Sequence, residues 1–105
     1  MKSILQDTKE CFQCRIEASL KKYHGDLSDQ GLEEHHIFGG TANRKKSEKH
    51  GLKVYLCNQK GHHRGPAGPH MNRLVDLSLK GIAQREFEKN HTRAEFIKEF
   101  GKSWL

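Results

Sequence analysis

Residues 32–40 read LEEHHIFGG, and this stretch lies at the centre of the expected fold. Residues 32–38 are typical of a β-strand, and the strand has to end at the two glycines that follow, whose backbone is free of the usual limits on φ. Two adjacent histidines, His35 and His36, stand inside this strand. An apolar core gains little from imidazole rings. The stretch therefore raises the question of which polar groups from other parts of the chain meet these two rings.

The segments that follow this strand alternate between polar and apolar character. Residues 41–51 (TANRKKSEKHG) are predicted to be a polar, basic connection, and residues 52–57 (LKVYLC) are predicted to be a second strand with β-branched and aromatic residues inside. Residues 58–69 are broken by glycine and proline, which predicts a loop. This loop carries a second histidine pair, His62 and His63.

Two helices are predicted after this loop. Apolar residues recur at three- and four-residue intervals from Met71 to Phe87, which predicts an amphipathic helix from residue 69 to about residue 89. Thr92, with Glu95 three residues later, has the pattern of a capping box, and Gly101 is a typical helix stop. A C-terminal helix is therefore expected from about residue 92 to about residue 101.

Length and composition limit the class of protein. A chain of 105 residues with 33% hydrophobic residues is expected to form one domain with a thin core, which metal ions or a partner would help to stabilise. The formal net charge of +6 indicates either a polyanionic partner such as nucleic acid or simply a soluble surface. No stretch is apolar enough for a secretory signal or a membrane span, so a reducing cytoplasm is the expected location.

Three cysteines, an odd number, fit poorly with a disulfide framework and favour metal ligation. Cys11 and Cys14 are spaced so that one tight turn brings both sulfurs to a tetrahedral ion, and Cys57 and His62 add two donors across a short loop. A zinc site with three cysteine ligands and one histidine ligand is therefore predicted. The alternative is that Cys57 is a small buried hydrophobic residue and the other two cysteines are free thiols. Residues 15–25, directly after this knuckle, are compatible with a short helix or with a charged hairpin arm.

The order of these segments resembles the HNH endonucleases, also called the His-Me finger or ββα-metal family, and in particular their small phage-encoded members. The resemblance extends from about residue 11 to residue 87 and rests on EEHHIFGG, on Asn43 within ANRKKSEKHG, and on LCNQKGHHRG. It implies an α+β fold with a small ββα-metal core, a zinc knuckle and C-terminal helices. The chain would then be a single HNH nuclease domain over residues 1–105, with the knuckle and core at about 11–89 and the last helix at about 92–101.

Members of this family hydrolyse DNA phosphodiester bonds with a divalent metal ion, and the resemblance assigns roles by position. His35 and His63 correspond to metal ligands, His36 to the general base, and Asn43 to the middle asparagine, which braces the loop by backbone hydrogen bonds. His70 is expected to complete the metal site, to contact phosphate or to begin the helix, and the choice among these three roles stays open.

The match to the family departs from its pattern in two places. The spacing from Cys57 to the closing histidine is longer than in the family, so His62 and His63 could exchange roles. The middle asparagine commonly stands directly before the second strand, where this chain has His50 and a glycine. His50 is therefore a second candidate for that position.

The chemistry of phosphodiester hydrolysis calls for these residue types independently. A base must take a proton from water near neutral pH, which suits histidine with its ordinary pKa of about 6.5. A divalent ion, whether Mg2+, Mn2+, Ni2+ or Zn2+, would stabilise charge on the phosphate and on the leaving oxygen. Neighbouring side chains on a regular strand point to opposite faces, so His35 and His36 are predicted to lie at a distorted strand end beside the glycines.

DNA is the expected partner, with a phage or host DNA-processing protein as a second one. The side chains predicted to contact nucleic acid are Arg44, Lys45, Lys46 and Arg64. The expected setting is the cytoplasm of a bacterial host, with the protein encoded by a phage or prophage. Two other functions fit the same sequence: a non-catalytic zinc module that binds DNA or protein, and a phage packaging or recombination factor whose nuclease activity depends on a partner.

Overall fold

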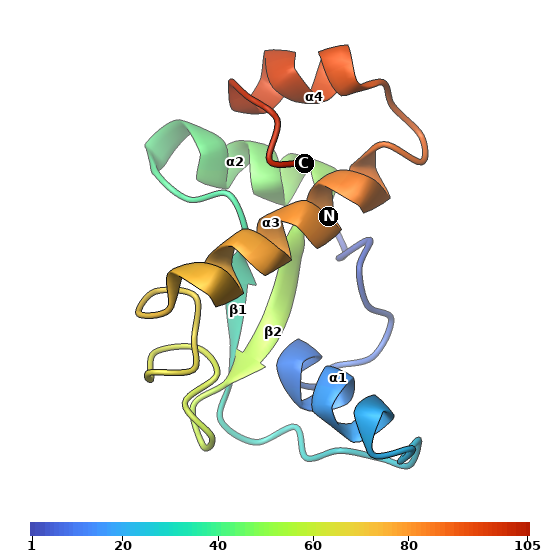
Figure 1. Cartoon of the computed structure of the whole chain (residues 1–105), viewed down its shortest axis with the longest axis vertical. Helices are drawn as coiled ribbons and strands as arrows, with labels where there is room; N and C mark the ends of the chain where they lie inside the picture. The colour runs from blue at the N-terminus through green and yellow to red at the C-terminus, as the bar shows by residue number, and fades with distance from the viewer.

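Two antiparallel strands form the centre of the molecule in the computed structural model, which describes all of residues 1–105 (Figure 1). β1 (Leu32–His36) and β2 (Lys53–Cys57) pair directly and form a two-stranded sheet. Their pairing continues residue by residue along both strands. The strands predicted at residues 32–38 and 52–57 are therefore confirmed, with slightly shorter bounds.

Four helices surround this sheet and complete an α+β fold. They are α1 (Phe12–Leu20), α2 (Thr41–His50), α3 (Arg73–Phe87) and α4 (Arg93–Phe100). In Figure 1, α3 lies across the two strands, α1 lies beside the end of β2, and α2 and α4 lie together at the opposite end of the sheet. Each helix is too short or too polar to cross a lipid bilayer.

The cysteine knuckle continues directly into helix α1, so residues 15–25 begin as a helix and not as a hairpin arm. Cys11 is the N-cap of this helix, and its Sγ accepts a hydrogen bond from the backbone nitrogen of Cys14 at 3.3 Å. The helix ends at Leu20. The cap fixes the two sulfurs of the knuckle relative to each other, because both belong to the first turn of the same helix.

The prediction of a connection at residues 41–51 is wrong, because these residues form helix α2. Its sequence has no apolar stripe, and Ser47 is its only buried residue, so the periodicity that indicates a helix is missing. Gly51 ends the helix in the left-handed conformation, with a φ of 69°. Contacts with β1 and α4 hold the helix in place. Tertiary packing therefore decides the structure of this segment.

Ser47 connects α2 to the segment that follows β1. Its Oγ donates a hydrogen bond to the carbonyl oxygen of Phe38 at 2.9 Å and accepts one from the backbone nitrogen of the same residue at 3.1 Å. Both residues are buried. Asn43 lies half-buried in the first turn of α2 and takes no part in these bonds. The side-chain bonds that brace this segment come from Ser47 and not from Asn43.

We expect Ser47→Ala to lower the free energy of unfolding by about 1–3 kcal/mol, because it leaves a buried backbone amide and a buried carbonyl without their partner. Urea denaturation followed by circular dichroism measures this change. Ser19→Ala, at an exposed position in α1, is the matched control and is expected to leave the midpoint almost unchanged. Equal stability of Ser47→Ala and the wild type would show that this serine does not brace the loop.

Helix α3 begins at Arg73, later than the predicted start at residue 69. Asn72 is the N-cap, and its side-chain oxygen accepts hydrogen bonds from the backbone nitrogens of Leu74 and Val75 at 3.0 and 3.3 Å. An asparagine in this extended conformation ends the preceding loop and satisfies the first free amides of the helix. His70 therefore lies in the loop before α3 and not on the helix.

The C-terminal helix packs onto the core through aromatic rings. The ring centre of Phe38 lies 4.6 Å from that of Phe100 and 5.4 Å from that of Phe96, and Phe96 lies 5.4 Å from Phe87 of α3. The predicted capping box and glycine stop of α4 are both present. This helix covers the segment directly after β1, which fixes the end of the strand that carries the histidine pair.

Candidate metal centres

Three sulfurs and one imidazole converge at the end of β2. The Sγ atoms of Cys11, Cys14 and Cys57 lie 3.5, 3.3 and 3.4 Å from Nδ1 of His62. The Sγ atoms of Cys14 and Cys57 are 3.7 Å apart. A tetrahedral ion with metal–sulfur bonds of about 2.3 Å holds its sulfurs about 3.8 Å apart. The four predicted ligands are therefore assembled into a candidate metal-binding cluster, which we call the cysteine cluster.

Burial of this cluster keeps two of its thiols protonated when no ion is bound. Burial, followed by the neighbouring sulfurs, raises the pKa of the Cys14 thiol to about 12, and burial also raises the pKa of Cys11. A divalent ion reverses this effect, because it favours the thiolate form. Nε2 of His62 lies 3.3 Å from the carboxylate of Glu17, which leaves Nδ1 facing the sulfurs. The donor set therefore suits an ion that prefers sulfur and nitrogen ligands.

A second cluster contains His35 of β1 together with His63 and His70 of the loop before α3; we call it the histidine cluster. One ring nitrogen of each residue lies within 4.8 Å of those of the other two. The Nε2 atoms of His63 and His70 are 3.3 Å apart. Of the two histidines whose roles the sequence left open to exchange, the structure places His62 with the cysteines and His63 with His35.

Nε2 of His35 is buried and has no hydrogen-bond partner. Such an atom is uncommon in folded proteins, because it has lost contact with water without gaining a replacement. Burial, with smaller effects of His70 and His63, lowers the pKa of His35 to about 3. The ring is therefore neutral, which is the form that binds metal ions. The unpartnered nitrogen and the neutral ring both fit a metal ligand.

Glu33 orients a second ring of the histidine cluster. Its Oε1 lies 2.9 Å from Nδ1 of His63, so that Nε2 of this ring is turned toward His70. Contacts with Asn58, His63 and Arg64 lower the pKa of Glu33 to about 2, so the carboxylate is ionised. Arg64, which was predicted to contact DNA, has its guanidinium 2.6 Å from Glu33 while its side chain is 73% exposed.

We expect Glu33→Gln to weaken the binding of Mn2+ or Ni2+ to the histidine cluster by about 10- to 100-fold, because the charged partner of a metal-binding imidazole raises its strength as a ligand. Isothermal titration calorimetry of protein that already holds its ion in the cysteine cluster measures the affinity. Glu86→Gln is the matched control, since Glu86 lies in the last turn of α3 and its only ion pair is with the exposed Lys89. Equal affinities for the two variants would remove Glu33 from the support of this site.

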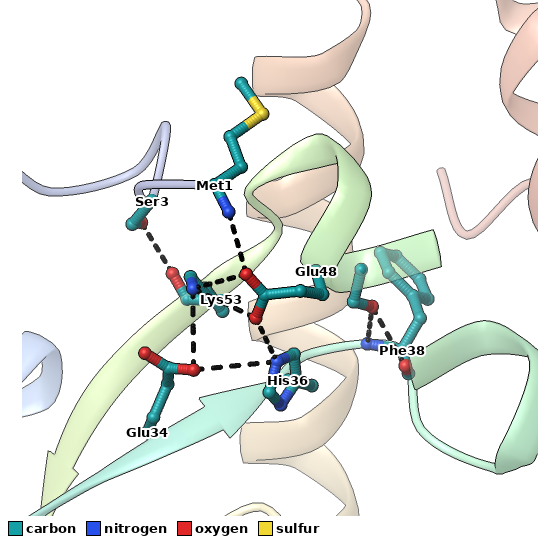
Figure 2. Close-up of polar contacts among 8 residues, drawn as sticks. Met1, Ser3, Glu34, His36, Phe38, Glu48 and Lys53 are labelled. Atoms are coloured by element: carbon teal, nitrogen blue, oxygen red, sulfur yellow. Dashed lines mark hydrogen bonds and ion pairs between the residues drawn. The ribbon is translucent and has the colours of Figure 1, made fainter. Parts of the chain in front are cut away.

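His36 lies on the face of the sheet opposite to His35. The strand pairing continues without interruption to His36, which stands opposite Lys53, and successive residues of a strand point to opposite faces. The predicted distortion of the strand end is therefore wrong. Figure 2 shows His36 beside Glu34 and Glu48. Its Nε2 lies 2.8 Å from Oε1 of Glu48 and 3.6 Å from Glu34.

The two ring nitrogens of His36 have different surroundings. Nε2 is paired with Glu48, whereas Nδ1 has no hydrogen-bond partner in the protein and is accessible to solvent. β1 has a neighbouring strand on one side only, so its other edge is unpaired.

The basic residues of α2 differ in their environments. Arg44 and Lys45 are exposed. Lys46 donates a hydrogen bond from Nζ to the carbonyl oxygen of Glu99 at 2.7 Å, which ties α2 to α4. His50, the second candidate for the position of the middle asparagine, lies 2.6 Å from the carboxylate of Glu99. Of the three side chains of α2 that were predicted to contact nucleic acid, Arg44 and Lys45 are therefore free to meet a ligand, and Lys46 is not.

Ser47 and Glu48 carry no sequence pattern that assigns them to these sites, although both shape them. They lie in a segment predicted to be an irregular connection, so nothing assigned them to a face. The run KKSEKH before Gly51 is the signal that finds them. Helix-forming residues followed by a glycine are typical of a helix end, and this pattern places positions 47 and 48 near the last turn, close to the strand that follows.

The chain matches no family model, no curated protein and no solved structure. The two clusters of metal-ligating side chains and the histidine beside them are the features of the molecule from which its function has to be inferred.

Proposed function

We propose that this protein is a metal-dependent HNH endonuclease that hydrolyses DNA phosphodiester bonds. One observation carries the proposal: His35, His63 and His70 converge around a buried unpartnered nitrogen, and the next residue after His35 presents a free, solvent-accessible imidazole nitrogen. This arrangement combines a set of metal ligands with a base one residue away. In this proposal β1, β2 and α3 form a small ββα-metal core.

The exposure of the two clusters supports different roles for them. The cysteine cluster has four protein donors, and three of the four are buried, which is typical of a structural metal site. The histidine cluster has three protein donors, and His70 is exposed. A site with three protein ligands and an open side is typical of catalytic metal centres. We therefore assign zinc to the first cluster and the catalytic ion to the second.

Imidazole ligands narrow the choice of catalytic metal. Nitrogen ligands suit Zn2+ and Ni2+, whereas Mg2+ prefers oxygen ligands. Mn2+ lies between these classes, and Mg2+ is the weakest candidate for the histidine cluster. An ion held there by His35, His63 and His70 would supply electrostatic stabilisation of the phosphate and the leaving oxygen.

His36 is the general base in this proposal. Its Nδ1 is the nitrogen that is free to accept a proton from an attacking water molecule. In this proposal the phosphodiester lies across the edge of β1 that has no neighbouring strand, with His36 on one face and the histidine cluster on the other. The positive charge needed to hold DNA comes from the net charge of +6, with Arg44 and Lys45 exposed on α2.

The cysteine cluster is connected to the histidine cluster through the chain. His62 belongs to the cysteine cluster and His63 to the histidine cluster, and the two are neighbours in one loop. An ion bound to the cysteines would hold this loop against α1 and the end of β2. It would therefore also hold His63 in position, which gives the zinc a role in activity as well as in folding.

Cleavage of supercoiled plasmid tests the proposal. The zinc-loaded protein is incubated with plasmid in the presence of Mn2+, Ni2+ or Mg2+, and the products are separated on an agarose gel. We expect metal-dependent conversion to nicked or linear DNA, fastest with the transition metals and abolished by EDTA. Absence of cleavage with every ion, in protein whose metal content has been verified, would contradict the proposal.

A non-catalytic zinc module that binds DNA is the second candidate, and the position of His36 on the opposite face from the histidine cluster favours it. This alternative predicts DNA binding that weakens steeply with salt and no strand cleavage. A third form, in which a phage or host DNA-processing protein activates the nuclease, predicts that cleavage appears only when that protein is added.

A further inference from the structure

His36, Glu48 and Lys53 form a connected set of polar contacts on the face of the sheet away from the histidine cluster (Figure 2). Oε1 of Glu48 lies 2.8 Å from Nε2 of His36. Nζ of Lys53 lies 3.0 and 2.9 Å from the two oxygens of the same carboxylate. Glu48 comes from α2, while the other two residues stand opposite each other in the sheet. The contact therefore depends on the packing of α2 against the strands.

The ionisation state of Glu48 determines which atom carries the hydrogen in this contact. Three groups hold the pKa of the Glu48 carboxyl well below its usual range by hydrogen bonding: the N-terminal ammonium of Met1, the ring of His36 and the ammonium of Lys53. An ionised carboxylate only accepts hydrogen bonds, so Nε2 of His36 has to be the donor. A neutral imidazole carries one N–H group, and Nδ1 then holds the lone pair.

We propose that Glu48 is a positioning residue for His36, which holds the imidazole in the tautomer with hydrogen on Nε2 and so keeps Nδ1 available as the proton acceptor. The inference rests on the proposed nuclease function for its catalytic consequence. In this role Glu48 contacts neither the attacking water molecule nor the phosphate. It acts through the orientation and tautomer of His36, and it would stabilise the imidazolium that forms when Nδ1 has taken up a proton.

Two features make Glu48, and not its neighbour Glu34, the partner of His36. Glu34 lies 3.6 Å from Nε2, beyond hydrogen-bond distance, while Glu48 lies at 2.8 Å. Lys53 contacts both carboxylates and so holds Glu48 in place by its charge. The same lysine argues against a metal ion among Glu34, His36 and Glu48, because its ammonium already neutralises the carboxylates that such an ion would need.

Nuclear magnetic resonance of the ring nitrogens measures the tautomer directly and without any activity. In zinc-loaded protein labelled with ¹⁵N at histidine, we expect His36 to show the pattern of the form with hydrogen on Nε2. Glu48→Ala is expected to shift this ring toward a mixture of tautomers. Glu48→Gln keeps an acceptor oxygen and is expected to retain the tautomer. The control is Glu99→Gln, which perturbs the other histidine–glutamate pair of α2, His50 with Glu99 at 2.6 Å.

Cleavage kinetics measure the catalytic consequence. We expect Glu48→Ala to lower kcat by about 10- to 100-fold, a part of what a positioned base contributes, with KM changed by less than about threefold. Glu48→Gln is expected to recover part of this loss. Glu99→Gln is expected to cleave at the wild-type rate. In a His36→Ala background, Glu48→Ala is expected to add no further loss, because the two residues act as one unit.

The outcomes separate this inference from the proposed function. A wild-type His36 with hydrogen on Nδ1, or a Glu48→Ala variant with unchanged tautomer and kcat, would overturn the positioning role while leaving the nuclease intact. An inactive wild type whose His36 carries hydrogen on Nε2, and loses this preference in Glu48→Ala, would support the contact and overturn the nuclease. Thermal unfolding of each variant verifies that the comparison is made between folded proteins.

Discussion

The His36→Ala variant is expected to cleave supercoiled plasmid about 10²- to 10⁴-fold more slowly than the wild type, which is the usual contribution of a positioned general base. The reason is specific to one nitrogen: Nδ1 of His36 is unpartnered and accessible, and alanine removes it. Initial rates of nicking at saturating metal measure the effect. Because the ligands of both clusters are untouched, metal content and thermal stability are expected to stay close to those of the wild type.

His24→Ala is the matched control for this experiment, since His24 is exposed and belongs to neither cluster. Like His36→Ala, this variant loses one imidazole and keeps the formal net charge of +6. It is expected to cleave at the wild-type rate. If His36→Ala cleaves as fast as His24→Ala, His36 is not the base, and the assignment of the catalytic face of β1 has to be abandoned even if the protein proves to be a nuclease.

Loss of the ion in the cysteine cluster is expected to produce the largest effect on stability. Cys57→Ser should lose one equivalent of zinc and its cooperative unfolding transition, because structural zinc sites contribute about 10–16 kcal/mol of binding energy that is available only to the folded chain. The net stability of a typical domain is about 5–15 kcal/mol, so a bound zinc ion would contribute about as much as the whole. Cys57 is 4% exposed and lies at the end of β2, where its Sγ is 3.7 Å from that of Cys14 in the knuckle.

Elemental analysis and circular dichroism during heating measure the zinc content and the unfolding transition. EDTA added to the wild type is expected to reproduce the behaviour of Cys57→Ser. His70→Ala serves as the comparison, because it removes a ligand of the histidine cluster and should leave both the zinc content and the transition intact. A wild type that contains no zinc, or a Cys57→Ser variant that melts as the wild type does, would contradict the structural role of the cluster.

The contrast between these variants follows from how each cluster is built. The cysteine cluster joins α1, the end of β2 and the loop after it, so its ion cross-links segments that are far apart in the sequence. The histidine cluster joins β1 to the loop before α3 and opens to solvent at His70. The first is therefore expected to control folding, and the second to control chemistry.

Much of the candidate site could be predicted from the sequence because its donors are unusual residues at short spacings. The pair Cys11 and Cys14, and the histidine pair at 62 and 63, indicate candidate metal ligands by residue type alone. Both strands and the caps of α4 were equally local features, since alternation and capping patterns depend on near neighbours. These features need no knowledge of the rest of the chain.

Other features were decided only by contacts between segments that are distant in the sequence. The helix at residues 41–50 has no apolar stripe to reveal it, and it forms because Ser47 and its contact with α4 hold it against the core. The regular pairing of β1 with β2 placed His35 and His36 on opposite faces, where the sequence had predicted a distortion that would bring them together.

The sequence by itself therefore determined which atoms are available to bind metal: three thiols and a set of histidines in a chain too polar to fold around a large core. Only the tertiary structure decided how these atoms are shared, with His62 among the sulfurs, His63 and His70 beside His35, and Glu48 on His36. The physical reason is that residue type is a local property, whereas the partner of each imidazole depends on strand register and helix packing, which no short stretch of the chain specifies.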